Sequence, residues 1–458
     1  MDQIEKQLVS YISGLSFERL SHGAVAATKE RLLDAFACAL AGFQQTPVKA
    51  ARAFAMKATA PDGATVFGTT HVAPVYDATF ALGTAIRALD WNDTYLSREP
   101  AHPSDNIAAA YSVAEGEKRN GKELITAIAL AYEMQCRLCD AAGIRKKGWD
   151  HVTYASVSAT AAAAKLLALS SAQIRDAIAI AVTTGNYLRQ TRIGTISNWK
   201  AAAFAKAARN GVEAALSVRH GFTGPSEIFT GQHGLIRQIT QGEFDFAPRL
   251  GGEGNEEFKI VSTYIKFFPA EYHSQSAIWA ALDLREKIGP ANIGKIASIS
   301  IETSHHSYEI IGMDRDKWAP KTKETADHSL PFIVAAALQD GEITLKQFDP
   351  KHLEDKALLG LVQKVKVSEN PEYTAIYGTS FPNKVTVTME DGRTFEKEVR
   401  DPKGHPLNPL SRKEIETKFR QAAGKLLPER QQDRAIDLIW NLEKVTNLKE
   451  LSDCFVVA

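Results

Sequence analysis

The chain has 458 residues, of which 44% are hydrophobic and 24% charged, a composition that is normal for a globular protein. Lys and Arg together number 54, as do Asp and Glu, so the formal net charge is zero. This balance argues against a general nucleic-acid or anionic-membrane binder, whose affinity comes from excess positive charge, but it leaves room for a local cationic pocket. The length exceeds that of one ordinary compact domain and predicts two.

The N-terminal residues 1–15 alternate charged and apolar side chains, as a surface helix does. They lack the basic start and apolar core of a signal peptide. No stretch reaches the length of a membrane span, because the alanine-rich run 154–169 is interrupted by Lys165 and alanine is only weakly apolar. We therefore expect a cytoplasmic protein.

Cys136 and Cys139, two of the four cysteines, form a C-x-x-C pair about one helical turn apart. A zinc site would need a second ligand pair at suitable spacing, which the sequence lacks. An iron–sulfur cluster usually takes three or four cysteine ligands. The two thiols are therefore interpreted as ordinary buried side chains.

Helical periodicity dominates about the first 260 residues. Many of the predicted helices are rich in Ala, whose small side chain lets helices approach closely, so we expect a tightly packed bundle. Ser171 is predicted to cap the helix that follows it. The helices are expected over residues 27–43, 105–116, 123–142, 154–169, 172–184 and 201–220.

The pattern changes after about residue 262, where short alternating runs predict strands. Residues 296–302 and 362–367 alternate in this way. Residues 384–399 form two such runs around Asp391 and Gly392, and this dipeptide is a strong hairpin signal. Helices are expected between the strands, over residues 276–288 and 330–338 and near Thr344, which has capping-box spacing to Gln347.

Helix is predicted again after the hairpin, over residues 412–426 and 430–442, with Ser411 and Glu414 as a capping box. These helices most simply rejoin the N-terminal bundle. The predicted fold is therefore mostly α with an α+β insertion. Residues 1–264 and 403–458 would form a large all-helical domain, and residues 265–402 a smaller α+β lid domain. A cleft between the two would be the default active site.

Familiar cofactor and nucleophile motifs are absent. The sequence has no Walker loop, no H-E-x-x-H and no G-x-S-x-G, and GGEG at residues 251–254 lacks the spacing of a dinucleotide fingerprint. Five polar clusters instead interrupt the apolar, helical sequence. These clusters are the candidates for chemistry.

The first cluster, LDWNDTYLSREPAHPSDN, contains Asp90, Asp93 and His102. The two aspartates are expected to share one face of a helix end. Prolines on both sides of His102 force an extended chain, and a histidine held in this way suits acid–base work near neutral pH. The alternative is a surface loop with helix-capping aspartates.

The second and third clusters lie before predicted helices. His151 follows Asp150 and precedes an apolar helix, whose N-terminus lowers a histidine's pKa and favours bound anions; the alternative is a capping segment with an incidental histidine. Arg189, Arg192 and Lys200 lie near the start of the next helix, where they could bind carboxylates. A solvated basic loop is the alternative there.

The fourth and fifth clusters lie in the second half of the chain. Lys266 sits among aromatic residues at the entrance to the α+β domain, where it could close over a substrate anion, or it is one snorkelling lysine of a strand. Asp327, His328 and Ser329 are polar residues at the start of an apolar helix and could simply cap it.

Six segments, in order and over nearly the whole chain, resemble the MmgE/PrpD family of 2-methylcitrate dehydratase and cis-aconitate decarboxylase. HPSDN contrasts with HPSG in decarboxylase relatives, and SNWK and ETADHSLP also look more like the dehydratases. The matching segments are LDWNDTYL with HPSDN, GWDHVTY, LRQTRIGTISNWKAAAFAKAARNGVEAAL with GFTGP, KFFP, ETADHSLP, and PKGHP at residues 402–406.

The resemblance implies a helical domain with a smaller lid, an active site between them, and usually a homodimer. It also implies no cofactor, no metal and no iron–sulfur cluster, and a place in the methylcitrate cycle of propionate catabolism. By this resemblance the catalytic residues are Asp93, His102, His151, Lys200 and Lys266. The substrate-binding candidates are Arg192, Asp90, Ser104, Asp105, Tyr154, His273 and His328.

Dehydration of 2-methylcitrate breaks a C–H bond next to a carboxylate and expels hydroxide. The two lysines and Arg192 would bind carboxylates and stabilise the developing charge. We expect His102 to be the base and His151 the acid, or the reverse, with Asp93 orienting a histidine. Open alternatives are decarboxylation of cis-aconitate, epimerisation of an amino-dicarboxylate, and non-catalytic binding of a di- or tricarboxylate.

Overall fold

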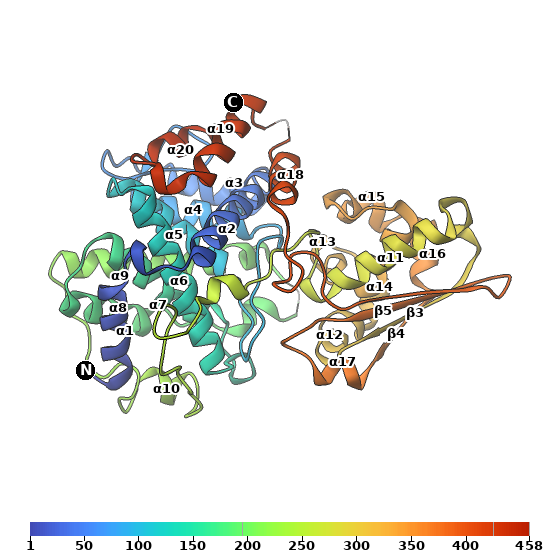
Figure 1. The fold of residues 1–458 in the computed structure, drawn as a ribbon, viewed down its shortest axis with the longest axis horizontal. Coiled ribbons are helices and arrows are strands. Elements are labelled where there is room, and N and C mark those ends of the chain that lie inside the picture. The colour runs from blue at the N-terminus through green and yellow to red at the C-terminus, as the bar shows by residue number, and fades with distance from the viewer. Residues whose placement is uncertain (195, 425, 458) are drawn as a thin grey trace. The chain divides into compact units, whose positions relative to one another are not determined.

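The computed structural model describes residues 1–194, 196–424 and 426–457. The chain forms two compact units. The helical unit consists of Met1–Ile265 and Ser411–Ala458, and the α+β unit of Lys266–Leu410 (Figure 1). The prediction of a mostly α protein with an α+β portion is confirmed.

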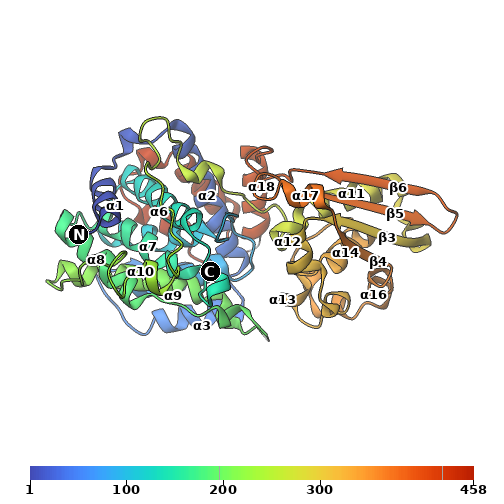
Figure 2. The same ribbon diagram turned by 90° about the horizontal axis from the view of Figure 1, so that it is seen from below.

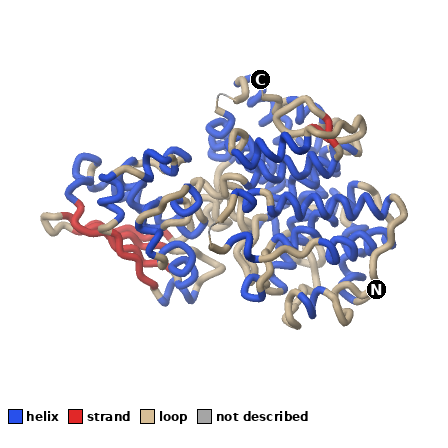
Figure 3. Tube along the Cα trace, turned by 180° about the vertical axis from the view of Figure 1, so that it is seen from behind, coloured by secondary structure: helices blue, strands red, loops and turns tan. Residues whose placement is uncertain are grey.

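The helical unit is built around α7, which is buried along almost its whole length and packs against α5, α6, α8 and α9. Small residues allow this close packing: a Cβ added at Gly211 of α9 would lie 2.8 Å from the backbone nitrogen of Thr160 in α7. Figure 3 shows how little strand this unit contains, namely β1 (Ala64–Thr65) paired with β2 (Val72–Ala73). Its helices are α1 Gln3–Gly14, α2 His22–Ala41, α3 Thr46–Ala55, α4 Val75–Arg87, α5 Ile107–Gly116, α6 Gly121–Ala141, α7 Val152–Leu166, α8 Ser171–Thr184, α9 Ala203–Arg219, α10 Leu235–Gln238, α18 Arg412–Ala423, α19 Glu429–Trp440 and α20 Lys449–Asp453.

The C-terminal helices complete the helical unit. Helix α18 packs against α2, and the buried Lys418 of α18 lies with its Nζ 2.6 Å from Oδ1 of the buried Asp34 in α2. The same ammonium donates to the backbone oxygen of Trp91 at 3.0 Å. One lysine therefore ties the last part of the chain both to an N-terminal helix and to the loop after α4.

The α+β unit contains a four-stranded sheet in the order β4-β3-β5-β6. Strand β3 (Ile296–Thr303) is parallel to β4 (Val365–Glu369) and antiparallel to β5 (Asn383–Met389), which pairs with β6 (Thr394–Val399). The predicted hairpin is confirmed, because Asp391 and Gly392 lie between β5 and β6 and Gly392 has a positive φ of 86°.

Helices cover one face of this sheet. Every second residue of β5 is buried, and α11 and α14 pack against the strands (Figure 2). Ile299 of β3 and Val385 and Val387 of β5 join the apolar residues of α11 and α14 in one core. The helices of this unit are α11 Gln275–Ile288, α12 His305–Ser307, α13 Lys323–Ala326, α14 Leu330–Asp340, α15 Pro350–Leu353, α16 Lys356–Val362 and α17 Pro371–Ala375.

Two predicted boundaries are wrong by a few residues. Ser170, and not Ser171, caps α8, because Ser170 and Gln173 exchange side-chain and backbone hydrogen bonds as a capping box. The strand predicted from residue 362 begins at Val365, since α16 continues to Val362. In both cases adjacent residues fit the same sequence pattern equally well. The pattern therefore identifies a helix or strand more reliably than the residue at which it begins.

The chain returns to the helical unit at Ser411. Side chains of residues 403–410 contact the preceding part of the α+β unit. Asn408 donates to the backbone oxygen of Asp401 at 2.9 Å, and the buried His405 ring lies 5.9 Å from the Phe381 ring.

All four cysteines are buried and none is in a disulfide. Burial raises the pKa of the Cys136 and Cys139 thiols well above the ordinary value, so the interpretation of this pair as buried thiols is confirmed. Among the described residues, no group of three or more His, Cys, Asp and Glu side chains could hold a metal ion. Within the same part of the chain, none of the helices combines the length and apolar character needed to cross a membrane.

Candidate active site

The segment after α4 does not continue as helix, so the expectation that Asp90 and Asp93 share a helix face is wrong. Helix α4 ends at Arg87, and Asp90 adopts a left-handed backbone conformation with φ of 53°. This turn directs the Asp90 carboxylate between two cations. Its Oδ1 lies 2.8 Å from Nη1 of Arg87, and its Oδ2 lies 3.3 Å from Nζ of Lys200.

Asp93 anchors the loop that carries His102. Its buried carboxylate accepts hydrogen bonds from the Ser104 backbone nitrogen at 2.9 Å and from the Tyr132 hydroxyl at 2.7 Å, while burial raises its pKa. The carboxylate thus joins the loop to α6. The backbone oxygen of Asp93 lies 2.8 Å from Nδ1 of His102. The main chain of Asp93, and not its carboxylate, therefore orients the His102 ring.

This contact defines the protonation of the His102 ring. A carbonyl oxygen only accepts hydrogen bonds, so Nδ1 of His102 carries the hydrogen. The neutral ring then has its lone pair on Nε2. That nitrogen lies 3.0 Å from Nη2 of Arg87, which only donates.

Ser104 and Asp105 follow His102 directly in the chain and are fully buried. Asn92 donates to the Ser104 hydroxyl at 2.9 Å and to Oδ1 of Asp105 at 2.8 Å. Burial raises the pKa of Asp105 well above its usual value, and its Oδ2 lies 3.9 Å from Nε of Arg87. Both side chains therefore take part in hydrogen bonds within the loop.

His151 takes the N-cap position of α7, as its place before the helix predicted. Its ring centroid lies 5.8 Å from that of His102, which brings the two predicted acid–base residues together. Burial and the nearby Arg192 guanidinium lower the pKa of His151 to about 4, so the ring is neutral near pH 7.

Arg192 is joined to the same helix end through Asp150. Its Nε lies 3.0 Å and 2.8 Å from the two carboxylate oxygens of Asp150. Burial opposes ionisation of Asp150, but the Arg192 guanidinium outweighs it and holds the pKa of this carboxyl well below its usual range.

Three buried nitrogen atoms near the start of α7 have no hydrogen-bond partner among the described residues: Nη2 of Arg192 and both ring nitrogens of His151. Nδ1 of His151 lies 2.9 Å from Oδ1 of Asp150, but that contact lacks hydrogen-bond geometry. A buried donor without an acceptor is costly. The cluster therefore offers a place for the acceptor atoms of a ligand.

Tyr154 lies on α7 one turn from His151, but its hydroxyl has a partner of its own. It donates to the backbone oxygen of Ala142 at 3.0 Å, and the side chain is fully buried. Its role in this geometry is to fix the chain after α6.

Two further predicted residues belong to the α+β unit. Lys266 is its first residue and is buried. Nδ1 of the buried His273 lies 2.8 Å from Oε1 of Glu271, and its Nε2 lies 2.9 Å from the Tyr377 hydroxyl. Burial raises the pKa of Glu271, but His273 more than offsets this and lowers it to about 2.

The fifth predicted cluster precedes α14 in the same unit. Ser329 caps this helix by accepting from the Phe332 backbone nitrogen at 3.1 Å, so the helix-cap interpretation is confirmed for this residue. Nδ1 of His328 lies 2.5 Å from Oδ1 of Asp327. Nζ of Lys323 lies 3.1 Å from Oδ2 of Asp327.

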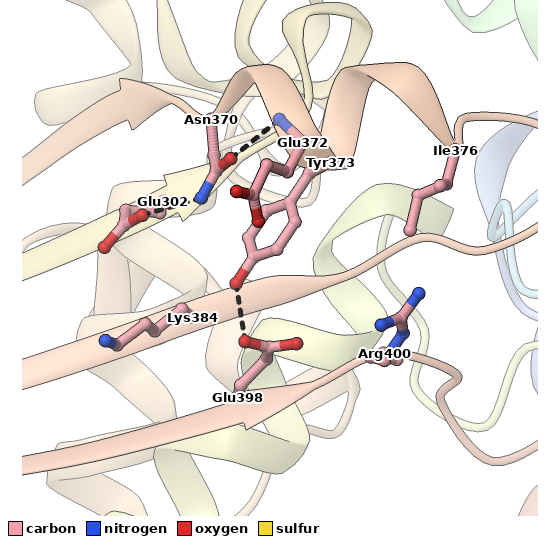
Figure 4. Close-up of a pocket in the computed structure, with 8 residues that line it drawn as sticks. All are labelled: Glu302, Asn370, Glu372, Tyr373, Ile376, Lys384, Glu398 and Arg400. Atoms are coloured by element: carbon pink, nitrogen blue, oxygen red, sulfur yellow. Dashed lines mark hydrogen bonds between the residues drawn. The ribbon is translucent and has the colours of Figure 1, made fainter.

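A separate hollow of about 400 Å³ on the α+β unit contains none of the predicted residues (Figure 4). Tyr373 donates to Glu398 at 2.8 Å and Asn370 to Glu302 at 2.9 Å, so much of its polar lining is already paired. Three carboxylates against two cations do not suit a tricarboxylate. The lining residues are Glu302, Asn370, Glu372, Tyr373, Ile376, Lys384, Glu398 and Arg400.

The helical unit thus contains a buried acid–base cluster suited to an anionic molecule: two adjacent histidines, guanidinium and ammonium groups, and carboxylates that hold them. The MmgE/PrpD N-terminal domain matches residues 6–247, and the MmgE/PrpD C-terminal domain matches residues 268–444. The chain belongs to the MmgE/PrpD family.

Relatives of known name cover nearly the whole chain. It is 30% identical to the 2-methylcitrate dehydratase of Salmonella typhimurium strain LT2 and 29% identical to that of Escherichia coli K12, each over 98% of this chain and 96% of the relative. It is also 29% identical to the alkylcitrate dehydratase phiI of a fungal strain, over 85% of this chain and 81% of the relative. Dehydratases of this kind are hydro-lyases.

Proposed function

We propose that the protein is a hydro-lyase that removes water from 2-methylcitrate, or from a related citrate-type tricarboxylate, by acid–base chemistry of its side chains. The observation that carries this proposal is the cluster of His102, His151 and Arg192, in which two imidazole rings lie 5.8 Å apart beside a buried guanidinium nitrogen that lacks an acceptor. A carboxylate of the substrate supplies that acceptor. The names of the relatives support 2-methylcitrate as the substrate.

In the proposed reaction, Nε2 of His102 accepts the proton from the carbon next to a carboxylate. The electron pair of that C–H bond forms the new C=C bond, and the hydroxyl on the neighbouring carbon leaves. His151 gives this hydroxyl a proton, so that water and 2-methyl-cis-aconitate are formed. Arg192 and Lys200 bind carboxylates and offset the charge that develops.

Other parts of the prediction stay proposals. Lys266 is proposed as a catalytic residue on the family resemblance, and His273 and His328 are proposed as residues that bind the substrate. We also propose the domain bounds predicted from the sequence, a homodimeric assembly, a cytoplasmic location and the absence of a cofactor. Ser104, Asp105 and Tyr154 are proposed to act by supporting the cluster, since their polar groups contact the protein itself.

An ultraviolet assay tests the function. Purified, chelator-treated protein is given 2-methylcitrate, citrate and isocitrate separately, and the absorbance of a conjugated aconitate-type product is followed. Absorbance that rises with 2-methylcitrate despite the chelator is the expected result. No change in absorbance with any of the hydroxy acids, together with itaconate detected by mass spectrometry after incubation with cis-aconitate, would instead assign the decarboxylase activity.

Substrate binding is expected to draw a proton from solvent onto His151. The pKa of this ring is lowered to about 4, so it is neutral at pH 6.5 before the substrate binds. Carboxylates placed beside it favour the charged ring and raise the pKa, so protonation rises on binding. Calorimetric titration with a tricarboxylate in buffers of different ionisation enthalpy measures this uptake.

The matched variant for this titration is His151→Asn, which is expected to bind with less proton uptake. His220→Asn changes an exposed histidine and is expected to leave the uptake as it was. Equal uptake in the His151→Asn variant and the unmodified protein would contradict the assignment of the proton to His151.

A further inference from the structure

We propose that Arg87 is the positioning residue that keeps His102 able to accept a proton at Nε2. The inference rests on the proposed function, because it concerns the residue assigned there as the base. Arg87 is the last residue of α4, and its side chain is only 2% exposed. It lies outside every motif that the sequence singled out, in the apolar stretch LGTAIRALDW.

The guanidinium of Arg87 faces three polar groups, two of them at hydrogen-bond distance. Its Nη1 lies 2.8 Å from Oδ1 of Asp90, its Nη2 lies 3.0 Å from Nε2 of His102, and its Nε lies 3.9 Å from Oδ2 of Asp105. A planar guanidinium presents its donors in fixed directions, so a single side chain can serve a carboxylate and an imidazole together. A lysine has one nitrogen and cannot span both.

The contacts at the two ring nitrogens of His102 select the same tautomer. The backbone oxygen of Asp93 lies 2.8 Å from Nδ1 and can only accept, so Nδ1 carries the hydrogen. Arg87 can only donate, so the atom that it faces, Nε2, must be the unprotonated one. The ring is thus held at both ends with its lone pair toward Arg87.

The charges around this ring explain why a cation is needed there. Oδ1 of Asp90 lies only 3.8 Å from Nε2 of His102, and an unopposed carboxylate at that place would favour a hydrogen on Nε2. Arg87 binds that same oxygen, while Lys200 faces the other oxygen of Asp90. The ring of His151, whose centroid lies 5.8 Å from that of His102, is neutral near pH 7 and adds no charge.

The contact between Arg87 and Nε2 is broken when His102 takes the proton of the substrate. Arg87 therefore acts before the reaction, by holding the ring in the orientation and protonation state of a base. Loss of this positioning is expected to lower kcat by about 10²-fold, with a smaller change in KM, because the substrate carboxylates are bound by other cations.

The experiment combines nitrogen-15 spectra of histidine-labelled protein with kinetics of Arg87→Ala. In the unmodified protein we expect the His102 resonances, assigned with the His102→Asn variant, to show Nδ1 protonated and Nε2 unprotonated and hydrogen-bonded. In Arg87→Ala we expect the Nε2 resonance to move and kcat to fall. Added guanidinium ion is expected to restore part of both.

Arg209→Ala is the matched control, since Nη1 of Arg209 lies 2.8 Å from Oδ1 of Asp77, the same distance as in the Arg87–Asp90 pair. This variant is expected to leave the His102 spectrum and kcat unchanged, and guanidinium should have no effect on it. Where Arg87→Ala folds poorly, Arg87→Gln combined with Asp105→Asn removes the cation together with the fully buried carboxylate beside it, while Asp90 keeps Lys200 as a partner.

The proposal is overturned if His102 carries its hydrogen on Nε2 in the unmodified protein, or if kcat of the folded Arg87 variants matches that of the Arg209 control. The spectra need no substrate. A protein with the expected His102 spectrum that turns over no tricarboxylate would therefore refute the proposed function and leave the Arg87 contact standing. Turnover with a normal kcat in the Arg87 variants would refute the role of Arg87 and leave the proposed function standing.

Discussion

His102→Asn is expected to lower the rate of 2-methylcitrate dehydration by roughly 10²–10⁴-fold, the usual contribution of a general base. Asparagine can keep a donor near the Asp93 backbone oxygen, which in the native protein lies 2.8 Å from Nδ1 of His102. It has no lone pair basic enough to take a proton from carbon. The ultraviolet assay, run at saturating substrate, measures the loss.

The control for this variant is His220→Asn, which alters an exposed histidine at the end of α9 and should keep full activity. Circular dichroism and the unfolding midpoint of His102→Asn should stay close to those of the unmodified protein, so that the loss is not a loss of fold. Near-full turnover by a folded His102→Asn protein would exclude this residue as the base and shift attention to His151.

Lys418→Met is expected to lower the free energy of unfolding by roughly 3–5 kcal/mol, the cost of breaking a buried ion pair. Its ammonium lies 2.6 Å from Oδ1 of Asp34, and both residues are buried. Burial already raises the pKa of Asp34, and without the lysine this carboxyl must either stay charged in an apolar surrounding or take up a proton. Urea unfolding followed by circular dichroism measures the change.

Arg434→Met provides the comparison, because Arg434 and Glu450 form an exposed pair at 3.3 Å and such pairs contribute at most about 1 kcal/mol. The double variant with Asp34→Asn and Lys418→Met should recover part of the loss, since no buried charge then lacks a partner. If Lys418→Met costs no more than Arg434→Met, the pair does not tie α18 to the rest of the helical unit.

Local sequence signals identified most of the helices and the hairpin of the fold. The helix after His151, the long helix α9, the β5–β6 hairpin at Asp391 and the capping box of Ser411 are all present in the structure. Each signal depends on residues within a few positions of one another, and periodicity or capping chemistry acts over that range. The polar clusters were found in the same way, because charged residues in apolar helical sequence stand out.

The partners of those residues could not be found from sequence. Arg87 has no motif around it, and Tyr132, whose hydroxyl binds Asp93, is one tyrosine within a long buried helix. Arg87 and Asn92 became relevant only when the left-handed turn at Asp90 brought the loop back over the end of α4. No periodicity predicts such a turn at an aspartate.

By itself, the sequence determined that the chain is mostly helical with an α+β portion, where most of its elements lie, which family it resembles, and that His102 and His151 are candidates for acid–base chemistry. Only the tertiary structure decided that the two rings are neighbours, that the Asp93 main chain and Arg87 orient His102, and that Arg192 reaches Asp150. The physical reason is that helix and turn preferences act between residues close in the chain, whereas hydrogen bonds and desolvation depend on which distant segments the core brings together.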